Sequence, residues 1–148
     1  MRLVIDASTV VAEALRVSGR ELIAHDVLEL FVAAEAWNEA VYELDRRWVI
    51  FKDRGLISDE RMAILQGQVQ TLLDGSFTII TPQRYQDRLA EATWRIPRDP
   101  SDAPSVALAL ALECGIWTND RDFFGCGLPV WVTEPLRSYV VEQEKAAN

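Results

Sequence analysis

Aspartates recur in this chain where a short apolar segment gives way to a turn or leads into one. They follow the apolar residues 3–5, precede the small apolar residues 103–114, and follow residues 116–118. The aspartates concerned are Asp6, Asp99, Asp102, Asp120 and Asp122. Carboxylates brought close together repel each other unless a cation lies between them. If the fold gathers these acids, the pattern predicts a divalent-cation site, with Asp6 and Asp120 as its strongest pair.

The ligand types indicate which cation and which reaction such a site would suit. All these side chains offer oxygen and the set contains no histidine, so Mg²⁺ or Mn²⁺ is expected rather than zinc. Such ions activate a water and stabilise charge on a phosphoryl group, particularly as a pair about 3.5 to 4 Å apart. The predicted chemistry is therefore hydrolysis of a phosphodiester bond, with Asp99 and Glu39 as candidates for the general base.

Several of the aspartates also have a structural interpretation. Asp6 could be a turn or helix-capping residue. Asp102 stands where the next helix needs an N-cap, a role compatible with metal binding because a capping carboxylate keeps one oxygen free. Asp122 could equally form a turn or pair with Arg121, which makes it a secondary ligand at best. Asp99, before a proline, has the same alternatives.

Short β-rich runs alternate with helical patterns along the whole chain. Strands are predicted at 3–5, 27–33, 77–80, 116–118 and 130–133, and helices at 10–16, 35–52, 58–73, 83–95, 103–114 and 134–144. This alternation predicts an α/β fold, a Rossmann-like parallel sheet with helices on both faces, in one domain spanning residues 1–148. Gly19 and Gly115 are expected to end the helices before them. Because parallel strands point the same way, the acids after 3–5 and 116–118 should emerge at one edge.

The long helix 35–52 carries one more acid of interest. Its apolar face is formed by side chains spaced three or four apart, Trp37, Val41, Leu44 and Trp48. Glu39 and Glu43 share another face, near Arg46 and Arg47. The ordinary interpretation is that both glutamates are solvated charges that pair with arginines. Glu39 becomes a site residue only if this helix packs beside the first strand.

The acidic composition bears on the substrate. The chain has 15 basic and 23 acidic residues and a formal net charge of −8. That sign disfavours a nucleic-acid partner, because phosphate contacts favour basic surfaces. Two divalent ions in the predicted site would bring the charge to about −4. The acidity therefore does not exclude a phosphodiester substrate.

Other functional classes find no support in the sequence. Neither of the glycine-rich phosphate loops GxGxxG and GxxxxGK[ST] occurs. His25 is the only histidine, and Cys114 and Cys126 are too few for a disulfide framework and lack zinc-type spacing. No apolar run approaches the roughly 18 residues of a membrane helix, and residues 1–5 lack a signal-peptide pattern. We therefore expect a cytoplasmic protein with no membrane partner.

Four motifs follow one another in a recognisable order: DAST at 6–9, WNEAVYEL at 37–44, SDAPSVAL at 101–108 and TNDRDF at 118–123. Together they resemble the PIN-domain nucleases, and most of all the VapC-type ribonucleases of bacterial toxin–antitoxin modules. Each motif alone is weak, but the four in this order cover essentially the whole chain. The resemblance implies the PIN-domain fold, a pocket for Mg²⁺ or Mn²⁺, cleavage of single-stranded RNA, and a homodimer.

The resemblance assigns roles to particular residues. The catalytic and metal-binding positions carry over to Asp6, Glu39, Asp102 and Asp120. Asp99 and Asp122 match auxiliary acids of some members. The position of Glu39 stays open, because Glu35 and Glu43 flank it. The candidate substrate-binding residues are Ser8, Arg98, Thr118, Asn119 and Arg121.

The predicted function is that of a metal-dependent endoribonuclease that hydrolyses RNA phosphodiester bonds, as the toxin of a VapBC-type module with an antitoxin partner. The chain departs from the family in the helical insert 58–73 and in its closing helix, which leave room for a different partner surface. The alternative is a catalytically silent PIN-like module that serves as an RNA- or protein-interaction domain.

Overall fold

The computed structural model describes the chain from Met1 to Asn148. Its strands are β1 (Arg2–Ile5), β2 (Glu29–Ala33), β3 (Phe77–Ile80), β4 (Gly115–Trp117) and β5 (Val130–Trp131). Its α-helices are α1 (Ala7–Ala14), α2 (Val17–Ile23), α3 (Ala34–Asp53), α4 (Asp59–Gly75), α5 (Leu89–Arg95), α6 (Ala103–Leu112) and α7 (Thr133–Ala147). None of these helices combines the length and the apolar character needed to cross a bilayer.

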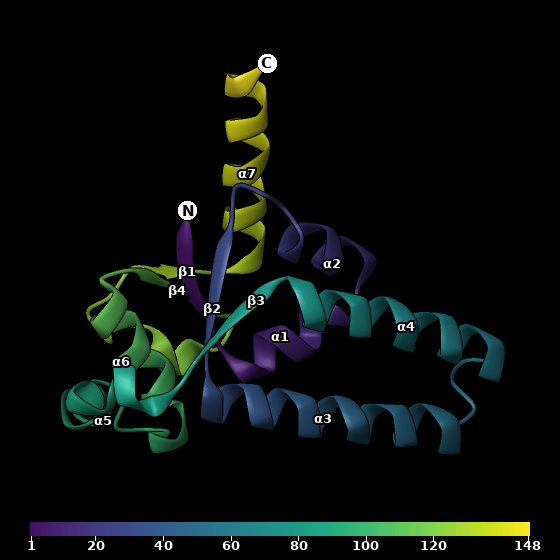
Figure 1. Ribbon diagram of the computed structural model, residues 1–148, viewed down its shortest axis with the longest axis horizontal. Helices are drawn as coiled ribbons and strands as arrows, with labels where there is room; N and C mark the ends of the chain where they lie inside the picture. Colours follow the sequence, from purple (N-terminus) through teal and green to yellow (C-terminus); the bar gives the residue numbers. More distant parts are fainter.

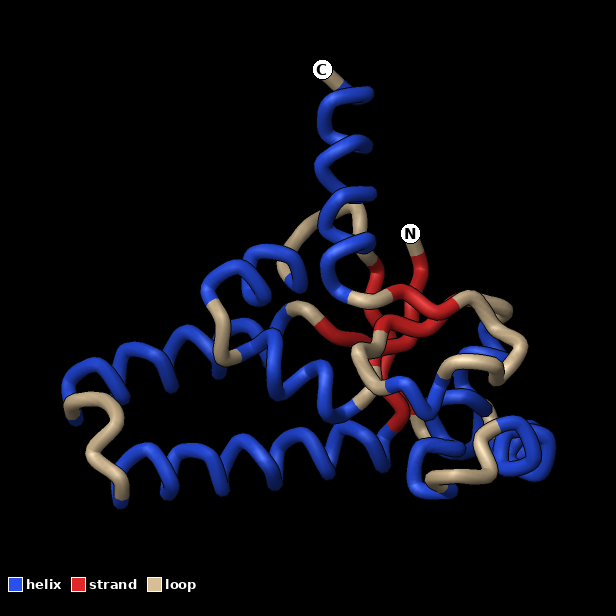
Figure 2. Tube along the Cα trace, turned by 180° about the vertical axis from the view of Figure 1, so that it is seen from behind, coloured by secondary structure: helices blue, strands red, loops and turns tan.

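The five strands form one sheet in the order β3-β2-β1-β4-β5, and all neighbouring strands are parallel. The predicted α/β fold with a parallel sheet is confirmed. Figure 1 shows α5 and α6 on one side of the sheet and α1 to α4 on the other, and Figure 2 shows the same layers from behind. The helix α7 extends beyond the sheet, and the long α3 and α4 run side by side away from it.

The strand order reverses at β1, which creates the usual ligand position of an open α/β sheet. From β1 the chain builds outward through β2 and β3, then returns to place β4 and β5 on the other side of β1. Ile5 pairs with Trp117, so the residues that follow β1 and β4 leave the sheet side by side. Ligands bind in the crevice outside the carboxyl ends of strands at such a switch point. Asp6 follows β1 at this edge, and Asp120 follows β4.

The core explains why β1 and α6 hold this edge rigidly. Leu3, Val4 and Ile5 are buried, as expected for a central strand covered on both faces. Along α6 the buried side chains are mostly small, which lets the helix approach β1 and β2 closely. A rigid strand and a closely packed helix are suitable supports for side chains that must be placed accurately.

Both glycine predictions were wrong, for reasons of tertiary structure. Gly19 does not end the first helix but lies inside α2, where an added Cβ would stand 2.2 Å from the carbonyl oxygen of Glu13. Gly115 begins β4, and its Cβ would stand 3.0 Å from the carbonyl oxygen of Pro129. The left-handed residue that ends α6 is Glu113, with φ of 52°. Close backbone approach therefore explains these two glycines better than helix termination does.

The helix predicted over 83–95 is also interrupted. Two 3₁₀ turns, Pro82–Arg84 and Gln86–Arg88, precede the shorter α5. Between them Tyr85 adopts φ of −135°, and its side chain is almost completely buried. Packing of this one aromatic ring takes its backbone out of the helical conformation. The strands predicted at 27–33 and 130–133 are shorter than expected, and Thr133 starts α7.

Candidate metal centre at the edge of the sheet

Asp6 lies at the carboxyl end of β1 and is 3% exposed. One carboxylate oxygen, Oδ2, accepts a hydrogen bond of 2.6 Å from the Ser8 hydroxyl. The other, Oδ1, is buried and has no hydrogen-bond partner. Burial raises the pKa of Asp6, although polar groups of Ser8, Thr9 and Thr118 oppose the rise. A buried carboxylate with one unsatisfied oxygen is costly for a fold unless a ligand completes it.

Asp102 stands between a 3₁₀ turn (Pro100–Asp102) and α6. It occupies the N-cap position of α6, as expected, but its side chain makes no capping hydrogen bond. Instead its Oδ2 is buried without a partner. The pKa of Asp102 is raised to about 7, first by burial and then by the negative charges of Asp99, Asp6, Asp120 and Glu39. These same acids come from four separate stretches of the chain, so the fold does gather them around Asp102.

Asp99 has a local structural role. Its Oδ1 accepts hydrogen bonds from the backbone N–H of Ser101 at 3.0 Å and from the Ser101 hydroxyl at 2.6 Å. It therefore caps the turn that presents Asp102. Its charge still contributes to the raised pKa of both Asp102 and Glu39.

Asp120 follows β4 and is held by its neighbours. Its backbone N–H donates to the hydroxyl of Thr118 at 3.0 Å, and its Oδ1 accepts from the backbone N–H of Asp122 at 2.8 Å. Thr118 is completely buried, so its hydroxyl holds the backbone of Asp120 in a fixed position. The carboxylate of Asp122 lies 3.4 Å from Nε of Arg98. It does not pair with Arg121, which was one of the two structural roles considered for it from the sequence. Arg98 and Arg121 are both exposed near this turn.

On α3 the structure distinguishes the three glutamates that the sequence left open. Glu35 accepts a hydrogen bond from the hydroxyl of the buried Tyr85. Glu43 forms an ion pair with Arg46 at 3.0 Å. Glu39 has neither kind of partner, and its pKa is raised by burial and then by the charges of Asp6, Asp99 and Glu43. Of the three, Glu39 is the glutamate that faces the aspartates.

The donor set fits a hard divalent cation. Three buried carboxylate oxygens have no hydrogen-bond partner, and two of them, on Asp6 and Asp102, are of the kind that Mg²⁺ and Mn²⁺ prefer; the third is Oε2 of Glu13 on α1. Burial, and then repulsion from the neighbouring acids, raise the pKa of Asp102, and a bound cation would relieve this repulsion. No three acidic, histidine or cysteine side chains are positioned to share one ion as they stand. Side-chain rotations or bridging waters would therefore complete the coordination, as is common for Mg²⁺.

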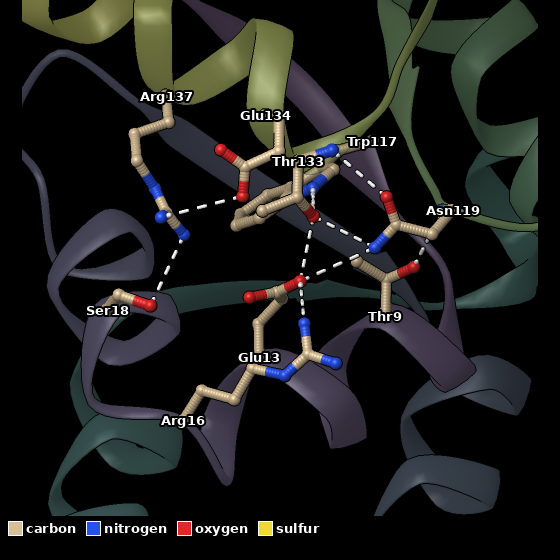
Figure 3. Close-up of polar contacts among 9 residues, drawn as sticks. All are labelled: Thr9, Glu13, Arg16, Ser18, Trp117, Asn119, Thr133, Glu134 and Arg137. Atoms are coloured by element: carbon tan, nitrogen blue, oxygen red, sulfur yellow. Dashed lines mark hydrogen bonds and ion pairs between the residues drawn. The ribbon is translucent and has the colours of Figure 1, made fainter.

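A buried network of hydrogen bonds lies behind the site, and the sequence did not predict it. Glu13 of α1 is completely buried, and its Oε1 accepts from the Thr133 hydroxyl at 2.7 Å. The same Thr133 oxygen accepts from Asn119 Nδ2 at 2.8 Å and from Trp117 Nε1 at 3.2 Å. Asn119 also donates through its backbone N–H to the Thr9 hydroxyl at 3.3 Å. Figure 3 shows Glu13, Asn119 and Thr133 converging from α1, the end of β4 and the start of α7.

The network has two consequences for the site. It fixes Asn119, the residue before Asp120, against α1, the helix that follows Asp6. The Asn119 side chain, predicted to contact substrate, is engaged in this internal network instead. The sequence did contain a signal, because Thr9 and Glu13 are four residues apart on one face of α1, and Glu13 interrupts an apolar run.

We expect Glu13→Ala to lower the free energy of unfolding by about 3 kcal/mol, because it removes the buried acceptor of the Thr133 hydroxyl and of a longer hydrogen bond, 3.4 Å, from Asn119 Nδ2. Urea denaturation of the metal-free protein measures this. Glu13→Gln should lose less, since its carbonyl oxygen can still accept from Thr133. Glu134→Ala is the matched control, because this exposed acid pairs with Arg137 at the surface and should change stability by less than about 0.5 kcal/mol. Equal stability of Glu13→Ala and wild type would contradict the role of the network.

The fold and this acidic edge together define a class, that of α/β proteins with a carboxylate-rich site at the sheet's switch point. The chain belongs to the PIN-domain family, whose model matches residues 4–141. PIN domains are generally metal-dependent nucleases. No curated protein matches the sequence.

A solved structure supports the fold. The crystal structure of PAE2754 from Pyrobaculum aerophilum is similar with a TM-score of 0.66 and 20% sequence identity. The similarity covers 97% of this chain and 91% of that one. At this level of identity the likeness concerns the fold alone.

Proposed function

We propose that this protein is a Mg²⁺- or Mn²⁺-dependent endoribonuclease that cleaves single-stranded RNA. The observation that carries the proposal is the pair of buried, unpartnered carboxylate oxygens on Asp6 and Asp102. Burial, and then the charges of neighbouring acids that include Asp120 and Glu39, raise the pKa of Asp102. Membership of the PIN-domain family supports the nuclease assignment.

In this proposal Asp6, Asp102 and Asp120 hold the cation, and Glu39 completes the site directly or through water. The bound ion would supply an activated water and positive charge beside the phosphoryl oxygens. The Ser8 hydroxyl keeps Asp6 in one orientation through its hydrogen bond. The raised pKa of Glu39 brings this carboxyl closer to the range useful for a general base. Arg98 and Arg121, exposed at the turns that carry Asp99 and Asp120, would neutralise the RNA backbone.

We further propose that the chain is the cytoplasmic toxin of a toxin–antitoxin module and forms a homodimer. Supporting this are exposed apolar side chains on the α3–α4 hairpin, among them Tyr42, Val49, Leu56 and Ile64. Several exposed large apolar side chains on one projecting hairpin favour a surface that a protein partner covers. The antitoxin and the second copy are the partners this proposal names.

Metal binding offers a direct test. At a Mn²⁺ concentration of 100 times the dissociation constant, binding to the folded state stabilises it by about 2.7 kcal/mol. We therefore expect Mn²⁺ or Mg²⁺ to raise the melting temperature clearly, whereas K⁺ at equal ionic strength should not. Gel analysis of a labelled single-stranded RNA should show cleavage only when the divalent ion is present. Unchanged melting and intact RNA would favour the non-catalytic interaction module instead.

A further inference from the structure

A groove of about 520 Å³ runs between α1 and α3 and reaches the acidic site. The α1 side of the groove consists of Ala7, Ser8, Val11, Ala12, Leu15 and, just beyond the helix, Arg16. The α3 side consists of Glu39, Glu43 and Arg47. The α3 residues are spaced by four, so they form one stripe along the helix. The groove therefore continues the site along both helices, away from the sheet.

The chemical character of the groove changes along its length. At the inner end Ser8 binds Asp6, and Glu39 faces the aspartates. Arg47 is eight residues further along α3, which corresponds to about 12 Å of helix. Arg16 is likewise eight residues after Ser8. Carboxylates thus stand at one end and guanidinium groups at the other, with an apolar floor from α1 between them.

The charges of the groove favour an anion at its outer end. Glu43, halfway along, is paired with Arg46 at 3.0 Å, so its charge is largely compensated. Arg16 is 64% exposed and lies 3.6 Å from the buried Glu13, which anchors it on one side and leaves donors free. Arg47 is exposed and takes part in none of the ion pairs of the structure. Two guanidinium groups with free donors match the geometry of a phosphate.

We propose that this groove is a binding subsite for the RNA strand next to the cleaved bond. Arg47 and Arg16 bind a flanking phosphate, and the ribose and base of that nucleotide lie on the apolar floor formed by Val11, Ala12 and Leu15. This inference rests on the proposed nuclease function, because the strand must also reach Asp6 and Glu39. About 12 Å of α3 lie between this phosphate and the phosphate at the acidic site. In the proposal a single RNA strand spans this distance and contacts both ends of the groove.

The neighbouring arginine on α3 provides a matched control. Arg46 has the same charge and nearly the same position in sequence, but it pairs with Glu43 and lies over the ring of Tyr42. General attraction between an arginine and RNA would make Arg46 and Arg47 equivalent. A defined subsite makes only Arg47 important.

The experiment measures binding without cleavage. Fluorescence anisotropy of a labelled, mixed-sequence single-stranded RNA is recorded with EDTA at several salt concentrations, with every variant made in an Asp120→Asn background. We expect Arg47→Ala to weaken binding about tenfold. The slope of log affinity against log salt should become shallower by about 0.7 in the Arg16→Ala/Arg47→Ala double variant, which loses the one flanking phosphate, and by less in Arg47→Ala alone. Arg46→Ala should stay within about twofold of the background protein.

The outcomes separate the subsite from the nuclease. If Arg47→Ala binds RNA as tightly as the background protein, or if Arg46→Ala loses as much as Arg47→Ala, the subsite is refuted while RNA binding itself stands. The groove would then be open to another occupant, such as a protein segment. If the background protein fails to bind single-stranded RNA in EDTA and the wild type fails to cleave it with Mn²⁺, the subsite and the proposed function are refuted together. Melting curves of all variants show whether a loss reflects unfolding.

Discussion

Replacing Asp6 by asparagine is expected to reduce divalent-ion-dependent cleavage of single-stranded RNA by about 10³-fold or more. Asp6 is the most deeply buried aspartate of the cluster, 3% exposed and with one oxygen that no group of the protein satisfies. Loss of a metal ligand forfeits several kcal/mol of transition-state stabilisation, and about 4 kcal/mol corresponds to roughly 10³ in rate. Initial rates with saturating Mn²⁺ measure the effect.

The same substitution should leave the fold intact, which distinguishes a chemical role from a structural one. Asparagine has nearly the shape of aspartate, and its carbonyl oxygen can still accept from Ser8. Burial raises the pKa of Asp6, so its charge is unfavourable in the metal-free protein. The metal-free Asp6→Asn variant should therefore be at least as stable as the wild type, while its stabilisation by Mn²⁺ should disappear.

Two glutamates of α3 act as internal comparison. Glu39→Gln should also lower the cleavage rate strongly, because Glu39 faces the aspartates. Glu35→Gln should change it little, because Glu35 is held by Tyr85 one turn away. Asp6→Asn activity within tenfold of the wild type would overturn the assignment of the site to these acids.

The fold was predictable because its signals are local. β1 is a β-branched run with no charged residue from Leu3 to Ile5, and all three side chains are buried. The helix α4 begins where the sequence indicates, with the Ser58 hydroxyl accepting from the backbone N–H of Arg61 at 3.2 Å. Alternation of such elements is sufficient for a parallel α/β sheet.

Local signals failed where distant packing determines the backbone. Gly19 has no Cβ because α2 passes against Glu13, a contact that no short-range rule contains. Tyr85 leaves the helical conformation because its ring is buried and its hydroxyl reaches Glu35, fifty residues away in sequence. In both cases tertiary contacts override an intrinsic preference.

Some residues of the candidate site could likewise be predicted from local sequence, whereas others depend on tertiary contacts. Asp6 and Asp120 could be placed from sequence because both follow strands of a parallel sheet. Choosing Glu39 over Glu35 and Glu43 required their partners, Tyr85 and Arg46. The Glu13–Thr133 hydrogen bond joins residues 120 positions apart, and only the folded chain reveals it.

The second large effect concerns pH and Asp102. We expect Asp102→Asn to stabilise the metal-free protein above pH 7 and to make no difference below about pH 4. The folded-state pKa of Asp102 is about 7, raised from an ordinary value of 3.8 by burial and by neighbouring acids. A raised pKa means that the folded state binds a proton which the unfolded chain has already lost. The wild type therefore keeps its full stability below the unfolded pKa and loses it as the pH rises through about 7.

The size of this effect follows from the shift and the exposure of the group. Asp102 is only half-buried, so solvent screening reduces the full linkage value, and we expect a difference of about 1 to 2 kcal/mol at pH 8. Urea denaturation in EDTA at pH 4, 5.5, 7 and 8.5 measures it. Asp45→Asn, which removes an exposed acid of α3, is the control and should follow the wild type throughout.

Saturating Mn²⁺ should reverse the order of stability of the wild type and Asp102→Asn above pH 7. This reversal connects the stability measurement to metal binding. A cation binds the ionised carboxylate, so Mn²⁺ affinity should rise with pH until Asp102 is deprotonated near pH 7. With saturating Mn²⁺ the wild type should then become more stable than Asp102→Asn at pH 8, the opposite of the order in EDTA. If Asp102→Asn is the more stable protein with and without Mn²⁺, then Asp102 is not a ligand, because a group that binds the cation cannot be removed without loss of the stabilisation that binding supplies.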